Sequence, residues 1–509
     1  MSRLSFPPQS VEFLAAALGL KSALPELAHA LSDDSREITP GMIFIARRGV
    51  AHSAQAYIQA ALDAGAVWVI SDEAYANDRV TVVADSAAAL VALVEVATGR
   101  SVAELHIIGI TGTNGKTSVA QFIASTLAAS GAPHTEKVGL IGTLGAGIWS
   151  PDLSQLQPTH NTTPGLLTVL VQCSAFLTQG VRYVVMEVSS HALAQNRLCG
   201  LPIRSAVFTN LSRDHLDYHH DMAAYFEAKA RLFAWPGLQT ALINFDSPQV
   251  EELLERLSPN VDCWAYGLGA PDWRVADCHQ ITVKKLELNA QGFNAQIATP
   301  VGEASINPAL IGLFNVANVM AALATVLALG MPLSVAVPAL NQVAPPLGRM
   351  QRISLPNGAV AVIDYAHTPD ALDQVLRALR DHRATGANII CVFGCGGDRD
   401  QGKRPLMAAA AERLADTVIL TSDNPRSESP EAIIAQMCAG LTKPNDVQIE
   451  RDRGKAIARA LAQAGDKDWV LIAGKGHETT QEIQGQITAF SDWEQVLAWC
   501  ASPNQGGAA

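Results

Sequence analysis

A glycine-rich segment carries the strongest chemical signal in this chain. It reads GTNGKT, follows the apolar run LHIIGI and precedes apolar residues at helical spacing over 119–127. A strand, a glycine-rich turn and a helix start form a phosphate cradle, because backbone N–H groups face the oxygens, a lysine neutralises the terminal phosphates and a hydroxyl reaches Mg²⁺. A glycine turn of purely structural use is the alternative. The predicted ATP-binding residues of this loop are Gly112, Thr113, Asn114, Gly115, Lys116 and Thr117.

Other strand-like runs also end at polar residues. VRYVVMEV ends before Ser189, SAVFTNL before Ser212 and TALINF at Asp246. In an open parallel sheet the ligand crevice lies at the carboxyl ends of the strands. We therefore expect these segments to line one site together with the phosphate loop.

The elements that must position these residues indicate an α/β protein of three domains. A chain of 509 residues is too long for one core. We expect a small α/β domain at 1–98, a central P-loop domain with a parallel sheet at 99–345, and a Rossmann-like, doubly wound domain at 346–509. The last assignment rests on strand-like runs at 359–364, 388–394, 416–421, 446–450 and 468–473 that alternate with amphipathic patterns. Residues 260–305 predict hairpins, with a turn at 289–292.

One uncharged stretch, Val319 to Leu340, is long enough for a membrane helix. Gly330, Pro332 and Pro338 interrupt it, so we expect a buried helix that ends near Leu329. The first residues lack the apolar run of a signal peptide, which predicts a cytoplasmic protein without a transmembrane segment.

The net charge and the cysteine content argue against two kinds of ligand, nucleic acid and a cysteine-bound metal. A net charge of −12 argues against nucleic acid, whose phosphates call for clustered Lys and Arg. The eight cysteines form no CxxC pair. We expect reduced thiols rather than a metal site.

Taken together, the motifs resemble those of the Mur ligases. They are DSR at 34, GTNGKT at 112, NTTP at 161, EVSSHALAQNR at 187, TNLSRDHLDYH at 209, DYAHTPD at 364, GCGGDRDQGKRP at 394, DNPR at 423 and AGKGHE at 473. The resemblance implies an acid–amino-acid ligase of peptidoglycan synthesis. Such an enzyme phosphorylates a carboxylate with ATP and lets an amine displace the phosphate from the acyl phosphate.

The resemblance also implies the catalytic groups. Lys116 would neutralise the transferring phosphoryl group, and Thr117, Glu187 and His215 would hold Mg²⁺, the last two from the ends of adjacent strands. A carboxylate and a neutral imidazole suit that role. Lys229 matches the position where the family carries a carbamylated lysine (N6-carboxylysine). An ordinary solvated helix lysine is the alternative.

The implied carboxylate substrate is UDP-N-acetylmuramoyl-L-alanyl-D-glutamate. Its predicted contacts are Asn161, Thr162, Thr163, Ser189, Gln195 and Arg197, with Ser35 at the uridine. A helix cap before Pro164 is an alternative role for the two threonines. The implied adenosine and phosphate contacts beyond the loop are Asn318, Arg349, Asp364 and His367.

The implied amine is meso-2,6-diaminopimelate, which carries two ammonium and two carboxylate groups. Its predicted contacts are Arg399, Asp423, Asn424, Pro425, Arg426, Gly474 and Glu478. Arg426 of DNPR would bind the distal carboxylate bidentately and so reject lysine, which lacks it. An Asx-type turn with Arg426 paired to an acid such as Glu428 is the structural alternative.

Other functions remain open at this point. A lysine-adding Mur ligase and a folylpolyglutamate-type ligase share the chemistry, and a P-loop switch shares the nucleotide loop. We expect a monomer.

Overall fold

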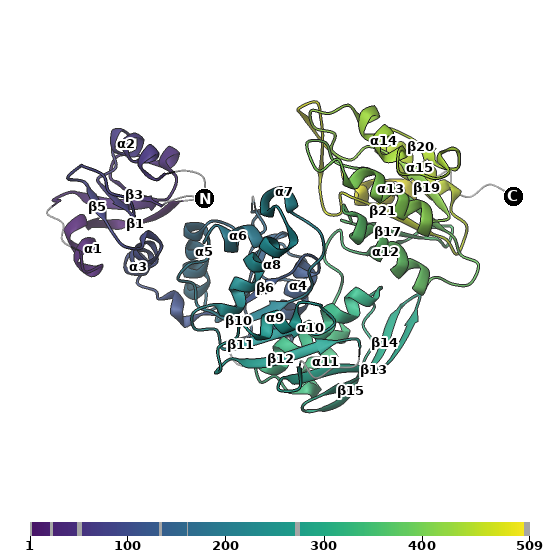
Figure 1. Cartoon of the computed structure of the whole chain (residues 1–509), viewed down its shortest axis with the longest axis horizontal. Coiled ribbons are helices and arrows are strands. Elements are labelled where there is room, and N and C mark those ends of the chain that lie inside the picture. Colours follow the sequence, from purple (N-terminus) through teal and green to yellow (C-terminus); the bar gives the residue numbers. More distant parts are fainter. Residues whose placement is uncertain are drawn as a thin grey trace.

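The computed structural model describes residues 3–20, 24–47, 53–131, 135–159, 161–269 and 275–502. Figure 1 shows three units that follow one another in chain order. Each unit is built on its own sheet, of five, ten and six strands respectively. The mixed α/β class expected from the sequence is therefore confirmed.

The N-terminal sheet has the order β1-β2-β3-β4-β5. Only β1 is antiparallel to its neighbour. Helices α1 and α3 pack on one face and α2 on the other. The elements are β1 Arg3–Ser10, α1 Val11–Ala17, β2 Leu27–Ser32, η1 Ser35–Glu37, β3 Met42–Ala46, α2 Gln55–Asp63, β4 Trp68–Ser71, β5 Val80–Val82 and α3 Ser86–Thr98.

The central sheet has the order β15-β14-β13-β12-β11-β10-β6-β9-β7-β8. Its strands are β6 His106–Thr111, β7 Val138–Gly142, β8 Gly145–Ile148, β9 Tyr183–Glu187, β10 Ile203–Phe208, β11 Thr240–Asn244, β12 Asp262–Gly267, β13 His279–Asn289, β14 Gly292–Thr299 and β15 Gly302–Ile306. Its helices are α4 Lys116–Ala129, α5 Leu166–Thr178, α6 Ser190–Ala194, α7 Leu216–His219, α8 Met222–Ala230, α9 Val250–Leu254, α10 Leu313–Ala328 and α11 Leu333–Asn341. The expected turn at 289–292 joins β13 to β14.

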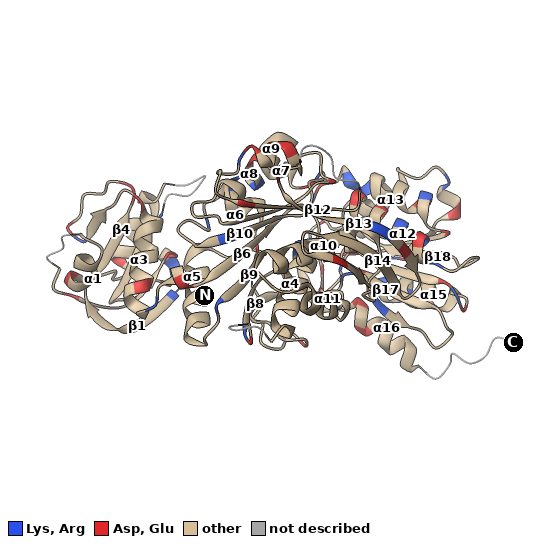
Figure 2. Ribbon diagram, turned by 90° about the horizontal axis from the view of Figure 1, so that it is seen from below, with Lys and Arg blue, Asp and Glu red and all other residues tan. Residues whose placement is uncertain are grey.

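Apolar residues on both faces of this sheet explain its helical cover. Helices α4, α10 and α11 pack on one face, whereas α5 and α8 pack on the other. The uncharged stretch forms α10 and α11, which appear without charged residues in Figure 2. Helix α10 ends at Ala328, close to the expected Leu329. None of the helices in the described part of the chain is long and apolar enough to cross a membrane.

The C-terminal sheet has the order β16-β17-β21-β18-β19-β20. It is parallel except for β16, and α12, α13 and α14 cover one face while α15 and α16 cover the other. This is the expected doubly wound arrangement. The elements are β16 Gln351–Ser354, β17 Val360–Asp364, α12 Pro369–His382, β18 Ile389–Phe393, α13 Lys403–Leu414, β19 Thr417–Leu420, α14 Pro430–Cys438, β20 Gln448–Ile449, α15 Arg453–Gln463, β21 Trp469–Ala473, the hairpin β22 Thr480–Ile483 and β23 Gln486–Ala489, and α16 Asp492–Ala501.

The β13–β14 turn docks on the C-terminal unit. His382 Nδ1 donates to Asn289 O at 2.7 Å, and its Nε2 accepts from Gly312 N at 3.1 Å. The guanidinium of Arg352 donates to Ala290 O at 2.9 Å. These contacts help to hold the C-terminal unit against the central unit.

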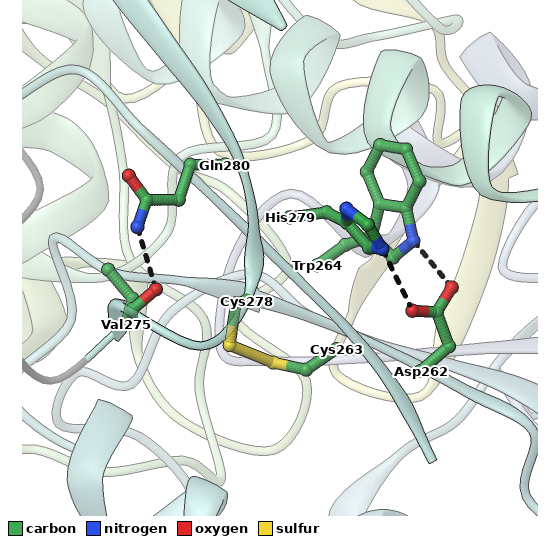
Figure 3. The surroundings of a disulfide bond; sticks show 7 residues. All are labelled: Asp262, Cys263, Trp264, Val275, Cys278, His279 and Gln280. Carbon is green, nitrogen blue, oxygen red and sulfur yellow. Dashed lines mark hydrogen bonds and ion pairs between the residues drawn. A yellow bond between two sulfur atoms is a disulfide. The ribbon is translucent and has the colours of Figure 1, made fainter. Parts of the chain in front are cut away.

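The expectation that all eight cysteines are reduced is wrong for one pair. Cys263 of β12 and Cys278, just before β13, form a disulfide (Figure 3). Trp264 and His279, the next residues, pair across the parallel strands, which brings the two Cα atoms to 4.8 Å. A sequence separation of 15 residues does not reveal this proximity, because strand register creates it.

Candidate active site

The phosphate loop lies between β6 and α4, as expected. Lys116 Nζ donates to Gly112 O at 2.8 Å and to Thr113 O at 2.9 Å, so its ammonium folds back over the loop. Burial lowers the pKa of Lys116, and the charges of Glu187 and Asp214 oppose that shift.

The glycine at position 115 is required by close packing. Its φ is +85°, and an added Cβ would lie 2.5 Å from Asn318 Oδ1. Asn318 belongs to α10, so the packing brings a predicted adenosine contact onto the phosphate loop. The loop is also fixed from the other side, because Asn114 N donates to Asn210 Oδ1 at 3.0 Å.

A buried carboxylate stands beside the loop. Glu187, at the end of β9, is only 2% exposed. Its Oε2 accepts from Thr117 Oγ1 at 2.8 Å, and its Oε1 accepts from Thr143 N at 2.8 Å. Thr143 was not predicted from the sequence, although it directly follows strand β7 and so fits the rule that polar residues at strand ends line the site.

His215 lies on the other side of the phosphate loop from Glu187, and both side chains line one cavity. The expectation that its strand adjoins that of Glu187 is wrong, because β6 lies between β9 and β10. This order places the phosphate loop between the two groups. His215 has a φ of +53°, and burial lowers its pKa, which favours a neutral imidazole. Within the described ranges, no three His, Cys, Asp or Glu side chains gather as a metal cluster.

Lys229 is not a solvated helix lysine. It is 1% exposed, and its Nζ donates to Gly112 O at 2.9 Å and lies 4.5 Å from the centre of the Tyr225 ring. Desolvation, reinforced by the charge of Lys116, lowers the pKa of Lys229 well below its ordinary value. The structure therefore favours an uncharged, nucleophilic amine at this position.

All the predicted nucleotide residues except Gly112 line one cavity of about 250 Å³. Its wall combines the phosphate loop with Arg349, Asp364 and His367 from the C-terminal unit. The guanidinium of Arg349 stacks 4.6 Å above the ring of Tyr365. Asp364 Oδ2 accepts from Met350 N at 2.8 Å, which joins β17 to the connection between the units.

The residues predicted for the sugar–peptide form a connected group next to Glu187. Thr163 Oγ1 donates to Glu187 O at 2.8 Å and accepts from Ser189 N at 2.9 Å. Arg197 donates to Thr163 O at 3.0 Å and contacts Gln195 Oε1. The helix-cap alternative is wrong, since α5 begins after Gly165 without a side-chain cap.

The remaining members of that set differ in placement. Thr162 accepts from Thr143 Oγ1 at 3.2 Å, and Asn161, which directly precedes it in the chain, is exposed. Ser35 lies in η1 of the N-terminal unit, and within the described residues no hydrogen bond joins it to this group. One hydrogen bond between the two units is donated by Arg47, which was not predicted from the sequence, to Asn196 O at 3.1 Å.

The predicted amine-binding residues come together at the ends of β18, β19 and β21. Asn424 Nδ2 donates to Glu478 Oε2 at 2.8 Å. Arg426 Nη1 donates to Gly397 O at 2.8 Å, and Gly397 directly precedes the short segment that carries Arg399.

The packing at Gly474 and the ion pair of Arg426 give further detail on the predicted amine-binding residues. Gly474 has a φ of +116°, and a Cβ there would lie 2.5 Å from Asp423 Oδ2, so only glycine allows Asp423 and the β21 end to meet. The structural alternative, in which Arg426 pairs with a nearby acid, is borne out, but the acid is not Glu428. Glu428 binds Arg404 at 2.8 Å, whereas the acid beside Arg426 is Glu482, at 3.8 Å.

Comparison with known proteins identifies the family. Residues 110–326 match the Mur ligase middle domain, and residues 348–476 match the Mur ligase glutamate ligase domain. This chain belongs to the Mur ligase family. UDP-N-acetylmuramoyl-L-alanyl-D-glutamate–2,6-diaminopimelate ligase of Pseudomonas aeruginosa is 43% identical over 487 residues, which cover 93% of this chain and 96% of that protein. The ligase of the same name from Coxiella burnetii is 42% identical and covers 92% and 95%.

Solved structures of Mur ligases have the same fold. A structure of a UDP-N-acetylmuramoyl-L-alanyl-D-glutamate–2,6-diaminopimelate ligase superposes with a TM-score of 0.70 and 35% identity, covering 97% of this chain and 99% of that one. Folylpolyglutamate synthase of Mycobacterium tuberculosis in complex with ADP reaches a TM-score of 0.59 at 22% identity, covering 76% of this chain and 91% of that one. At that identity the likeness concerns the fold alone.

Proposed function

We propose that this Mur ligase joins meso-2,6-diaminopimelate to the γ-carboxylate of the D-glutamyl residue of UDP-N-acetylmuramoyl-L-alanyl-D-glutamate. ATP phosphorylates the carboxylate to an acyl phosphate, and the amine then displaces phosphate. ADP, phosphate and the tripeptide nucleotide leave. The names of the relatives support the substrates, and the cavity between two units supports the use of ATP.

The chemistry needs a cation at the transferring phosphoryl group and a fixed carboxylate next to it. Lys116 meets the first need, since its Nζ already lies within the phosphate loop. Thr163 and Ser189 are hydrogen-bonded to each other beside Glu187, and this placement supports a fixed position for the substrate carboxylate. Arg349, Asp364 and His367 would hold the nucleotide from the opposite unit.

Mg²⁺ fits the residues beside the loop. The hydroxyl of Thr117 and the carboxylate of Glu187 are hard oxygen donors already in contact, and His215 offers a neutral imidazole in the same cavity. We propose these three residues as its holders. Bound there, Mg²⁺ would neutralise the charge that builds up on the phosphoryl oxygens.

Lys229 is suited to carbamylation. An uncharged amine adds to the carbon of CO₂, and loss of the amine proton leaves an anionic carbamate. The lowered pKa of Lys229 provides the uncharged amine, and the nearby Lys116 cation would stabilise the product. The modification would place an additional negative group beside the phosphate loop.

Selection of the amine falls to the C-terminal group. Arg426 and Arg399 offer guanidinium donors for carboxylates, while Asp423 and Glu478 offer acceptors for ammonium. Lysine would leave the guanidinium of Arg426 without a carboxylate, and that lost interaction disfavours it. A lysine-adding or folate-type ligase would have no need for Arg426 to bind a distal carboxylate of the amine.

We further propose that 1–98, 99–345 and 346–509 are the three domains, with Ser35 in the first at the uridine. All proposed contacts come from one chain, so the proposal needs no second copy. It places the reaction in the cytoplasm, where ATP and nucleotide-linked precursors occur together.

The observation that carries the proposal is the convergence of Lys116 and Glu187 with Arg349 and Asp364 around one cavity. Phosphate release measured with and without the muramoyl dipeptide nucleotide, diaminopimelate and lysine tests it. We expect release only when the dipeptide nucleotide and diaminopimelate are both present. A P-loop switch would release phosphate regardless of the amine, and a lysine-adding ligase would respond to lysine.

A further inference from the structure

One fully buried lysine in the C-terminal unit takes no part in the functions proposed above. Lys475 is 0% exposed. Its Nζ donates to Asn424 Oδ1 at 3.1 Å and to Glu478 Oε2 at 2.9 Å. A buried ammonium is costly unless acceptors surround it, so the fold retains this charge against a desolvation penalty.

The first consequence of Lys475 concerns the orientation of an amide. Asn424 Oδ1 accepts from both Lys475 Nζ and the backbone N–H of Glu482, the latter at 3.0 Å. Two donors on one side require the amide oxygen to face them, because an NH₂ group has no acceptor to offer. The NH₂ of Asn424 must therefore point to Glu478, where it donates to Oε2 at 2.8 Å.

The second consequence concerns the carboxylate of Glu478. Its Oε2 receives hydrogen bonds from both Lys475 and Asn424. Oε1 receives none from the part of the chain that the structure describes. Since one oxygen is held from two directions, rotation of the carboxylate is restricted, and Oε1 is left to accept a further hydrogen bond.

The ends of the strands that precede these side chains are held in a similar way. Arg453, also fully buried, donates to Ser422 O at 3.3 Å and to Ala473 O at 3.0 Å, and pairs with Asp492 at 2.7 Å. Ser422 and Ala473 directly precede Asp423 and Gly474 in the sequence. Arg453 thus ties together the ends of the two strands, while Lys475 orients the side chains that follow them.

We propose that Lys475 is a positioning residue for acceptor binding: it fixes the Asn424 amide and the Glu478 carboxylate in the geometry that receives an ammonium group of the amino-acid substrate. Lys475 acts through these two residues and does not touch the nucleotide cavity. The inference rests on the proposed function, because it specifies how that amine pocket is built.

The test is a steady-state comparison of wild type, Lys475→Met and Lys475→Gln. Methionine keeps the chain length but removes every donor, and glutamine keeps a donor of shorter reach. We expect KM for diaminopimelate to rise about 10- to 100-fold in Lys475→Met, as for loss of hydrogen bonds to charged groups, and less in Lys475→Gln. KM for ATP and for the dipeptide nucleotide should stay within about twofold. Lys467→Met, on the exposed surface of the same unit, is the matched control.

A double-mutant cycle separates positioning from general loss of stability. If Lys475 acts through Glu478, Lys475→Met should add little to the KM change already produced by Glu478→Gln. Additive effects, or equal increases in all three KM values, would overturn the inference. If Lys475→Met unfolds, the same cycle is read with Lys475→Gln. Failure of wild type to use diaminopimelate would instead overturn the proposed function, which keeps the two failures distinct.

Discussion

Thr117 Oγ1 donates a hydrogen bond of 2.8 Å to Glu187 Oε2, across 70 residues of sequence. The hydroxyl stands in the first turn of α4, and the carboxylate ends β9. The bond therefore joins the phosphate loop directly to the segment that carries the sugar–peptide residues. ATP and the carboxylate it activates meet at this point in our account.

Glu187→Gln tests the importance of that carboxylate. The amide keeps the size and can still accept from Thr117, but it removes the negative charge that suits Mg²⁺. We expect kcat to fall about 100-fold or more, roughly 3 kcal/mol in the barrier, with a higher requirement for Mg²⁺. Glu251→Gln, on the exposed face of α9, should leave both unchanged. Wild-type kcat in Glu187→Gln would argue against a role for this carboxylate in catalysis.

The strand ends explain why much of this site is predictable from sequence. Glu187 and the phosphate loop follow apolar strands, and parallel strands bring their carboxyl ends to one edge. Strand order is not predictable in that way. His215 and Glu187 were expected on adjacent strands, yet β6 separates β9 from β10, because order depends on crossovers that leave no local pattern.

Lys229 provides a test through carbon dioxide. Its lowered pKa means that the amine is uncharged, and hence reactive towards CO₂, at a pH where an exposed lysine is protonated. We expect activity to fall in CO₂-free buffer and to return when bicarbonate is added. Lys229→Arg should have low activity that bicarbonate does not restore. Identical wild-type rates with and without bicarbonate would contradict carbamylation as a catalytic requirement.

Arg426 provides a test of amine selection. Arg426→Ala should lower kcat/KM for diaminopimelate about 100-fold, because a guanidinium–carboxylate pair is lost, while the much lower kcat/KM for lysine should change little. Arg426→Lys should restore only part of the loss, since it lacks the planar fork. Arg459→Ala, exposed on α15, serves as control. An unchanged ratio between the two amino acids would refute the assignment of the distal carboxylate to Arg426.

Glu428 gives a stability prediction with a definite pH dependence. Its hydrogen bonds to Arg404 lower the pKa from 4.5 to about 2. A folded-state pKa below the unfolded value means that the stabilisation is complete above about pH 4.5 and disappears as the pH falls towards 2. We expect Glu428→Gln to lower the free energy of unfolding by about 2 kcal/mol at pH 7, a modest loss for a buried pair because Glu428 remains 20% exposed.

Urea unfolding at pH 7, 4.5 and 3.5 measures this effect. The difference between wild type and Glu428→Gln should narrow at pH 3.5, whereas Glu494→Gln, exposed in the same unit, should show little difference at any pH. A constant difference across the three pH values would mean that the ion pair is not its source.

Features that depend on register or on neighbouring units were beyond sequence reasoning. The Cys263–Cys278 bond depends on the pairing of β12 with β13. The partner of Glu428 is Arg404 of α13 rather than Arg426, two residues away in sequence, because α13 packs against the DNPR loop. Arg47 reaches Asn196 from another unit. In each case the relevant neighbour is set by tertiary packing.

The most direct measurement follows oxygen atoms through the reaction. The account holds that the γ-carboxylate of the dipeptide nucleotide attacks ATP, so one of its oxygens must leave with the phosphate. With an ¹⁸O-labelled carboxylate, ATP and diaminopimelate, mass spectrometry should find one labelled oxygen in each phosphate released. Tripeptide nucleotide formed together with unlabelled phosphate would contradict the acyl-phosphate mechanism at its centre.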